Sequence, residues 1–128
     1  MKTHHDATGQ VLIVTGGTSG IGLALAEAYL RAGGIVHVFG TRANPEVADG
    51  ITSHQVDVAN RAEVFDAVAK IVEAEGRIDA LVAAAAIQPR TTILGMDPSE
   101  WQRTIDVNLN GVMWAVQAVL PTMINAKR

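Results

Sequence analysis

Residues 11–22 read VLIVTGGTSGIG, where a short apolar run meets a glycine-rich turn that leads directly into a helical pattern. The five β-favouring residues at 11–15 are typical of a strand buried on both faces of a parallel sheet. The apolar residues that follow the turn recur at helical spacing on one face; they are Ile21, Ala24, Leu25 and Ala28. The stretch therefore predicts a strand, a tight loop and the N-terminus of a helix in succession.

This junction is chemically suited to a dinucleotide. Glycines let the backbone turn sharply and let a pyrophosphate approach main-chain N–H groups, while the first turn of a helix supplies unpaired donors and a partial positive charge. A plainer interpretation is that Gly16, Gly20 and Gly22 only punctuate a loop. The flanking strand and helix are the context that such a motif requires, so they favour dinucleotide binding.

Length and composition bound the class of protein. The chain has 128 residues, a net charge of −3 and no cysteine. It therefore has the length of one domain, and it offers no basic surface for nucleic acid, no disulfide framework and no thiolate chemistry. Residues 1–10 are polar, unlike a signal peptide, and the longest apolar run, at 78–87, is too short to span a bilayer. We expect a cytoplasmic protein without nucleic-acid or membrane partners.

Strand and helix patterns alternate along the rest of the chain. Further strands are predicted at residues 35–39, 53–58 and 78–87. The last of them is almost continuously apolar, so we expect both its faces to be covered. Helices are predicted from an N-cap at Asn60 to about Glu75, and from an N-cap at Asp97 past Asn108 towards Pro121. This alternation predicts an α/β fold with a parallel sheet and right-handed crossovers.

The pattern Thr15-Gly16-x-x-x-Gly20-x-Gly22 resembles the cofactor motif of the short-chain dehydrogenase/reductase family. The resemblance covers about residues 10–128 and corresponds to the first half of a family member. It implies a Rossmann-like three-layer α/β/α domain that binds NAD(P), with strand order 3-2-1-4, truncated before the fifth strand and preceded by a flexible tail at residues 1–9. It also implies that cofactor is bound by Gly16, Thr18, Ser19, Gly20, Ile21 and Gly22.

The residues after the second predicted strand bear on cofactor choice. A dinucleotide fold carries there an acid for a ribose 2′-hydroxyl or an arginine for a 2′-phosphate. No acid occupies Gly40 or Thr41, and Arg42 follows, whose guanidinium is a planar fork matched to phosphate. We therefore expect NADP(H) to be favoured over NAD(H). The alternative is that Arg42 is an ordinary solvated loop residue.

Asp57 and Val58 end the third predicted strand. A carboxylate at the carboxyl end of such a strand is well placed to accept a hydrogen bond from an amine. The resemblance implies that Asp57 holds the adenine amino group and that Val58 lies against the ring. The alternative is that Asp57 only caps the next turn.

Two later segments extend the resemblance. Residues 81–87, LVAAAAI, are similar to the family's Leu-Val-Asn-Asn-Ala-Gly-Ile, with Ala83 and Ala84 in place of both asparagines; these alanines can still pack under the cofactor and offer it backbone groups. Residues 107–111, VNLNG, match the family's Val-Asn-x-x-Gly, which implies that Asn108 is the helix-kinking asparagine of the catalytic tetrad. On the sequence alone, a solvent-facing asparagine is an equal alternative.

The catalytic Tyr-x-x-x-Lys pair of the resembled family does not occur in this sequence, whose sole tyrosine, Tyr29, is followed by Gly33 four residues later. The resemblance implies an NAD(P)(H)-dependent oxidoreductase that passes a hydride between nicotinamide and an alcohol or carbonyl. We expect this chain to be a truncated form that is inactive alone. A non-catalytic nucleotide-binding module and a natural or engineered half-domain with an assembly role stay open as alternatives.

Two surfaces predict self-association. In the order 3-2-1-4 the fourth strand is an edge, and residues 80–87 hold no proline or charge to blunt it. The final helix is apolar nearly all round, which is typical of a buried helix. Trp101, Ile105, Val112, Val116 and Leu120 form one stripe, and Val107, Leu109, Met113 and Trp114 lie on other faces. We expect a homodimer or larger assembly, joined through the fourth strands or the last helices.

Overall fold

The computed structural model describes residues 4–42 and 47–127. Its strands are β1 (Val11–Thr15), β2 (Ile35–Gly40), β3 (Ile51–Gln55) and β4 (Ala80–Ala83). Its helices are α1 (Gly20–Arg31), α2 (Arg61–Glu75), α3 (Pro98–Ile105), the π-helical turn η1 (Asp106–Asn110) and α4 (Gly111–Ala126). The strands form one parallel sheet in the order β3-β2-β1-β4, which confirms the predicted fold class and strand order.

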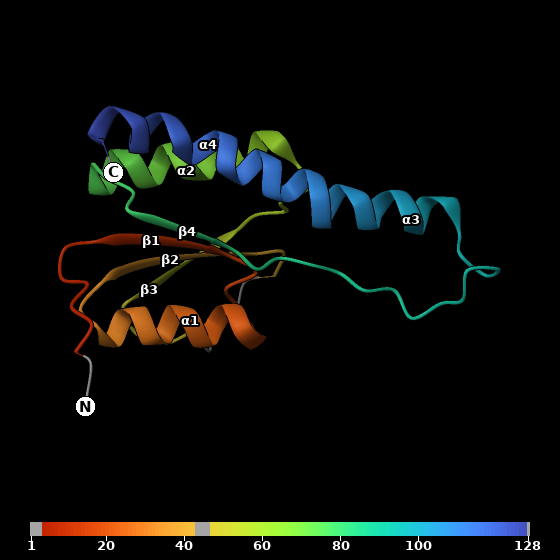
Figure 1. Cartoon of the computed structure of the whole chain (residues 1–128), viewed down its shortest axis with the longest axis horizontal. Helices are drawn as coiled ribbons and strands as arrows, with labels where there is room; N and C mark the ends of the chain where they lie inside the picture. Colours follow the sequence, from red (N-terminus) through yellow and green to blue (C-terminus); the bar gives the residue numbers. More distant parts are fainter. Residues whose placement is uncertain (1–3, 43–46, 128) are drawn as a thin grey trace.

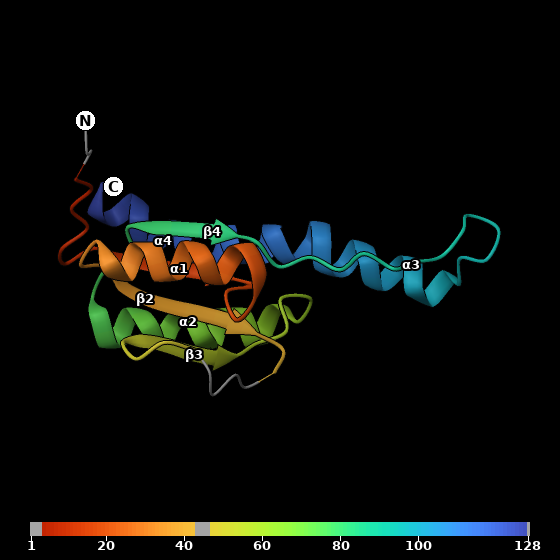
Figure 2. The same ribbon diagram turned by 90° about the horizontal axis from the view of Figure 1, so that it is seen from below.

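The sheet is the middle of three layers (Figure 1). Helix α1 covers one face, and α2 and α4 cover the other (Figures 1 and 2). Because successive strand residues point to opposite faces, Val11 and Ile13 join the core under α2 and α4, whereas Leu12 and Val14 join the core under α1. The continuous burial of β1 confirms the expectation that this strand lies inside the sheet.

Two strands differ from the prediction in length, and their neighbours explain why. Strand β3 spans residues 51–55 rather than 53–58, because it pairs with β2 from Val36, the partner of Ile51, to Gly40, the partner of Gln55. Strand β4 ends at Ala83 rather than at 87, because β1 ends at Thr15, the partner of Ala83. The expected full covering of β4 is also wrong: as an edge strand it is half-buried, and Ala83 is exposed.

The apolar face predicted for α1 points outward. Ile21 is 80% exposed and Leu25 is 43% exposed, and Ala24 and Ala28 are exposed as well. The fully buried residues of α1 are Gly22, which packs on the backbone of Gly16, and Ala26, which joins the core under the helix. Small side chains let a helix approach a sheet closely, so here steric fit chooses the buried face of a helix that is apolar on several sides.

The long C-terminal helix likewise buries a different stripe. Its fully buried residues are Val107, Gly111, Ala115 and Val119. Trp101, Val112 and Leu120, from the predicted stripe, are exposed. A Cβ on Gly111 would lie 2.7 Å from Cγ2 of Val58, so this glycine sets how closely the helix approaches.

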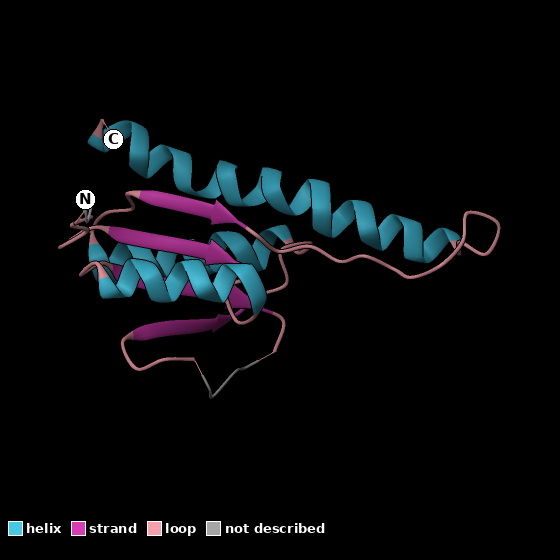
Figure 3. Ribbon diagram, turned by 60° about the horizontal axis from the view of Figure 1, so that its bottom comes forward, coloured by secondary structure: helices cyan, strands magenta, loops and turns pink. Residues whose placement is uncertain are grey.

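The helical rod α3–η1–α4 runs without a break through Pro121 to Ala126 (Figure 3). Proline removes one backbone hydrogen bond, but Pro121 and Gln117, whose carbonyl loses its partner, are both exposed to water. Within the described part of the chain, this rod is the one helix long and apolar enough to cross a membrane, a property that core helices of soluble proteins share. This rod lies outside residues 78–87, the longest apolar run in the sequence, so the length of that run did not reveal it.

The predicted N-terminal tail is partly tied to the domain. Ala7 is buried, and its N–H donates to the carbonyl of Ala32 over 2.8 Å. Residues 1–3 lie outside the described residues. The flexibility expected for residues 1–9 stays a prediction.

Two histidines on neighbouring strands lie side by side, His37 buried and His54 half-buried. His37, in β2, is 4% exposed, and its Nε2 lies 3.0 Å from Oε1 of Glu75. Its Nδ1 lies 2.9 Å from Nε2 of His54, in the neighbouring strand β3. Burial, followed by the nearby His37 and Lys70, lowers the pKa of His54.

This lowered pKa predicts that acid weakens the fold. The unfolded chain takes up a proton at His54 near pH 6.5, whereas the folded chain takes it up only at lower pH. Stability contributed by neutral His54 is therefore present above about pH 6.5 and is lost as the pH falls from there through the folded pKa. Urea unfolding of His54→Gln should show a smaller decline between neutral and mildly acidic pH than the wild type. The exposed His5→Gln is the control, and an unchanged decline in His54→Gln would contradict the assignment.

Candidate functional site

The glycine-rich loop after β1 folds as closely as the motif suggested. Gly16 and Gly20 have φ values of 66° and 56°, in the left-handed region that favours glycine. A Cβ on Gly22 would lie 2.2 Å from the carbonyl oxygen of Gly16, and a Cβ on Gly16 would lie 2.7 Å from Cα of Ala85. The backbone of the loop therefore packs directly against Gly22 on one side and against Ala85 on the other.

The N-terminus of α1 opens beside this loop. Ser19 is the N-cap residue and makes no side-chain capping bond, and the first turn holds no acidic residue. The first N–H groups of a helix have no acceptor within the helix, and they form the positive end of its dipole. This end of α1 can therefore receive an anionic group.

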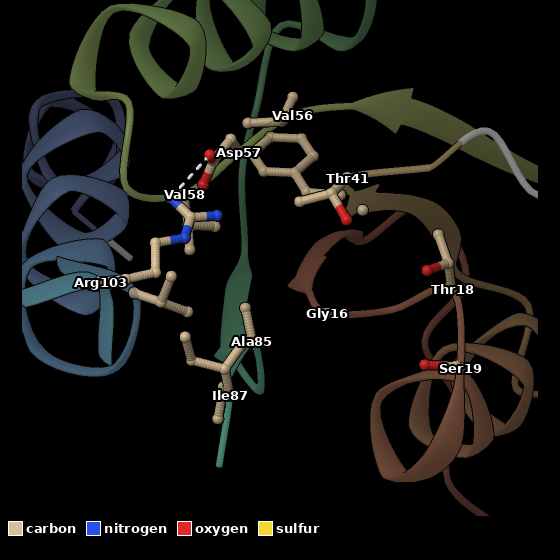
Figure 4. A pocket seen from close by; sticks show the side chains of 14 residues that line it. Gly16, Thr18, Ser19, Thr41, Val56, Asp57, Val58, Ala85, Ile87 and Arg103 are labelled. Carbon is tan, nitrogen blue, oxygen red and sulfur yellow. Dashed lines mark hydrogen bonds and ion pairs between the residues drawn. The ribbon is translucent and has the colours of Figure 1, made fainter. Parts of the chain in front are cut away.

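A cavity of about 180 Å³ lies at the carboxyl ends of the strands (Figure 4). One side is formed by the loop and the end of β2: Gly16, Thr18, Ser19, Phe39, Gly40 and Thr41. The rest is formed by the segments after β3 and β4 and by the long helix: Val56, Asp57, Val58, Ala85, Ala86, Ile87, Arg103 and Val107. Parallel α/β sheets bind ligands at this end of their strands.

Asp57 lies beyond the end of β3, in the turn before α2, and not on the strand as predicted. Its Oδ1 accepts a hydrogen bond from the N–H of Ala59 over 3.0 Å, and its own N–H donates to Oε2 of Glu63 over 3.0 Å. Its Oδ2 accepts from Nη1 of Arg103 over 2.9 Å. The carboxylate thus stabilises the turn, as the alternative interpretation suggested, and also faces the cavity.

The residues predicted to bind cofactor are placed unequally around the cavity. Gly16, Thr18, Ser19, Asp57 and Val58 line it. Gly20, Ile21 and Gly22 form the adjoining first turn of α1. Arg42 is exposed and follows the lining residue Thr41, while Ala83 and Ala84 precede the lining residues 85–87.

The alanine segment stays attached to β1 through its backbone. The N–H of Ala84 donates to the carbonyl of Thr15 over 3.1 Å, and the N–H of Ala85 donates to the Thr15 hydroxyl over 3.3 Å. These hydrogen bonds hold the segment after β4 against Thr15, although alanines stand at 83 and 84 where the family has asparagines. They bring the backbone of residues 85–87 to the floor of the cavity.

Asn108 holds that same segment from the other side. It lies in the π-helical turn η1, its Oδ1 accepts from the N–H of Ile87 over 2.8 Å, and its Nδ2 donates to the carbonyl of Ile87 over 2.8 Å. The residue is exposed, but its amide is engaged on both atoms. A role in a catalytic tetrad stays a prediction. The two hydrogen bonds themselves fix the backbone of Ile87, which lines the cavity.

Sequence reasoning missed several lining residues. Phe39, Gly40 and Thr41 could have been found, because they precede Arg42 at the end of a predicted strand. Arg103 carries no local signal, since its partner Asp57 is 46 residues away in the chain.

Comparison with known proteins places this geometry in context. The model of the family described as short chain dehydrogenase matches residues 10–128. The chain is 36% identical over 126 residues to an uncharacterized oxidoreductase of Staphylococcus saprophyticus, covering 91% of this chain and 54% of that protein. It is 35% identical over 131 residues to a 3-oxoacyl-[acyl-carrier-protein] reductase of Synechocystis, covering 94% of this chain and 53% of that protein.

A solved structure of a dehydrogenase has the same fold over nearly the whole chain. The ligand-free aldohexose dehydrogenase of Thermoplasma acidophilum superposes with a TM-score of 0.89 at 34% identity, covering 96% of this chain and 48% of that one. The chain spans about half the length of the curated relatives that it matches.

Proposed function

The chain belongs to the short-chain dehydrogenase family, and on this premise we propose that it binds NADP(H) as the cofactor-binding part of an oxidoreductase. The reaction is hydride transfer between nicotinamide and an alcohol or carbonyl. The observation that carries the proposal is that the glycine-rich loop, the end of β2, Asp57 and the alanine segment all meet at one cavity.

Each part of the cavity fits one part of a dinucleotide. The loop and the first turn of α1 receive the pyrophosphate on backbone N–H groups. Asp57 accepts a hydrogen bond from the adenine amine, and Val58 lies against the ring. The backbone of residues 85–87, held by Asn108 and Thr15, borders the space towards the nicotinamide. The nicotinamide would donate hydride to a carbonyl or accept it from an alcohol, and these residues would bind and orient the cofactor.

Calorimetric titration of the 128-residue chain with NADPH and NADH tests the proposal. We expect saturable binding of both, with NADPH tighter. Adenosine 2′,5′-bisphosphate, which carries the adenosine end alone, should compete for the same site. The absence of binding heat for either dinucleotide, with the protein folded, would refute the proposal.

Arg42→Ala should narrow the preference for NADPH over NADH. A charge-assisted hydrogen bond contributes about 1.5–3 kcal/mol, so its loss should reduce the ratio of the two Kd values by roughly tenfold or more. Arg31→Ala, which removes the same charge from the exposed C-terminal end of α1, is the matched control. An unchanged ratio in Arg42→Ala would leave the arginine as a solvated loop residue.

We also propose that the chain is cytoplasmic and forms a homodimer or larger assembly. Large apolar side chains are exposed along the helical rod: Trp101, Leu109, Met113 and Ile124 are 57–67% exposed. The second available surface is the free edge of β4. A second copy of the chain would bury these apolar side chains, which otherwise stay in contact with water.

Light scattering should therefore give at least twice the chain mass of 13.5 kDa. Met113→Glu should reduce this mass if the rods form the interface, and should leave it unchanged if the β4 edges do. A stable monomer that binds no apolar dye would contradict both forms of the assembly.

A further inference from the structure

Arg103 reaches from the long helix to the wall of the cavity. It lies in α3, where the helical rod extends past the end of the sheet (Figure 1). Its Nη1 donates to Oδ2 of Asp57 over 2.9 Å, and its guanidinium lies beside Asp57 at the side of the cavity opposite Thr18 and Ser19 (Figure 4). The two side chains are 45% and 33% exposed, so the ion pair is accessible to a ligand.

This contact completes the fixation of the Asp57 carboxylate. The N–H of Ala59 holds Oδ1 over 3.0 Å, and Arg103 holds Oδ2. A carboxylate oxygen accepts more than one hydrogen bond, so each oxygen keeps acceptor capacity for a ligand. Without Arg103, Oδ2 would lose its partner within the described part of the chain, and the orientation of the carboxylate would rest on one backbone N–H.

Arg103 also balances the local charge. A second hollow of about 490 Å³ adjoins the cavity through the shared residues Thr41, Asp57 and Arg103. Its lining includes the two carboxylates of Asp57 and Glu63, and Arg103 is the one cation among its described lining residues. A dinucleotide brings further negative charge, which this guanidinium offsets.

We propose that Arg103 is the positioning residue for base recognition: it aims the Asp57 carboxylate at the exocyclic amine and so sets the preference for adenine over a base with a carbonyl at that position. The reason is chemical, because an ionised carboxylate accepts hydrogen bonds and cannot donate one. It pairs with an amine and repels a carbonyl oxygen. The inference rests on the proposed dinucleotide function and adds a residue that contacts the recognition group rather than the base.

A purely structural role predicts something different. A half-exposed ion pair contributes little to the stability of a fold, so the unfolding midpoint of Arg103→Ala should stay close to that of the wild type. Base preference, in contrast, depends on the direction of the carboxylate and should respond strongly.

The test compares NADPH with its hypoxanthine analogue, in which a carbonyl replaces the adenine amine. Calorimetry on the wild-type chain should show NADPH bound roughly 10- to 100-fold more tightly, the range expected for a hydrogen bond to a charged group. In Arg103→Ala the ratio should fall to about threefold or less, and Arg103→Lys, which keeps a donor and the charge, should restore part of it. Arg31→Ala is the control for loss of charge and should keep the wild-type ratio.

A double-mutant cycle with Asp57→Asn separates positioning from an independent effect. Asp57→Asn alone should remove the preference, and adding Arg103→Ala to it should change nothing further. A wild-type ratio in Arg103→Ala, or a further loss in the double variant, would overturn the inference while the proposed function stands. A wild-type chain that binds neither dinucleotide would overturn the proposed function and this inference together.

Discussion

Gly22→Ala is expected to weaken dinucleotide binding severely. The added Cβ would lie 2.2 Å from the carbonyl oxygen of Gly16, and 3.1 Å from Cα of Gly17. These neighbours are backbone atoms of a loop that already packs on Ala85, so they cannot move away as a flexible side chain would. The loop and the first turn of α1 must separate, and the N–H groups that we propose receive the pyrophosphate then lose their common direction.

Overpacking of this kind costs about 1–3 kcal/mol, and displaced phosphate donors add to that loss. We expect the Kd for NADPH to rise by about 100-fold or more. Gly22→Asp should be at least as severe, because it also places a negative charge at the pyrophosphate.

Gly9→Ala is the matched control for this variant. Gly9 has a φ of 77°, so alanine is strained there as well, but a Cβ would meet nothing within 4 Å, and the residue precedes β1 at the other end of the sheet. Urea unfolding of both variants separates loss of fold from loss of binding. Wild-type affinity in a folded Gly22→Ala protein would remove the glycine-rich loop from the proposed site.

The 128-residue chain alone should show no hydride transfer above the uncatalysed rate. The cavity is lined by no tyrosine, histidine or lysine among the described residues. The sole tyrosine, Tyr29, donates its hydroxyl proton to Oε1 of Gln10 over 2.8 Å, and Gln10 directly precedes β1, at the opposite end of the sheet. Burial and the charge of Asp79 raise the pKa of Tyr29, which makes it a poorer acid.

Positioned proton transfer typically contributes about 10²- to 10⁴-fold to a rate. The one carboxylate among the described lining residues, Asp57, has both oxygens hydrogen-bonded, to the N–H of Ala59 and to Arg103. Absorbance of the reduced nicotinamide, followed with a panel of aldehydes and ketones, measures the rate. A relative of full length is the positive control. Turnover by the purified chain that disappears in Gly22→Ala would contradict the expectation, because the proton would then be transferred at this site without a tyrosine, histidine or lysine.

Binding without turnover also fits a non-catalytic nucleotide-binding module. The intact mass of the protein, compared with the length of its encoding gene, separates these two functions. A gene that continues beyond residue 128 favours the oxidoreductase.

Several local features were predictable because they depend on neighbours in the chain. The side chain of Asn60 accepts a hydrogen bond from the N–H of Glu63, and Asp97 accepts one from the N–H of Ser99, as N-cap residues do. Gly76 ends α2 in the left-handed conformation. The strand, glycine loop and helix at 11–31 follow from backbone sterics and apolar patterning, and they carry the family's cofactor motif.

Tertiary structure decided which faces and which pairs those elements present. Strand lengths at β3 and β4 follow from where their partners end, and the buried face of α1 follows from how closely Gly22 and Ala26 let it approach. The contact of Arg103 with Asp57 and that of His37 with Glu75 join residues 46 and 38 positions apart. Hydrophobic burial is non-directional, so the sequence by itself determined a parallel α/β sheet with a tight glycine-rich loop after its first strand. Only the tertiary structure determined which side chains line the cavity, because the orientation of each depends on contacts with residues far away in the chain.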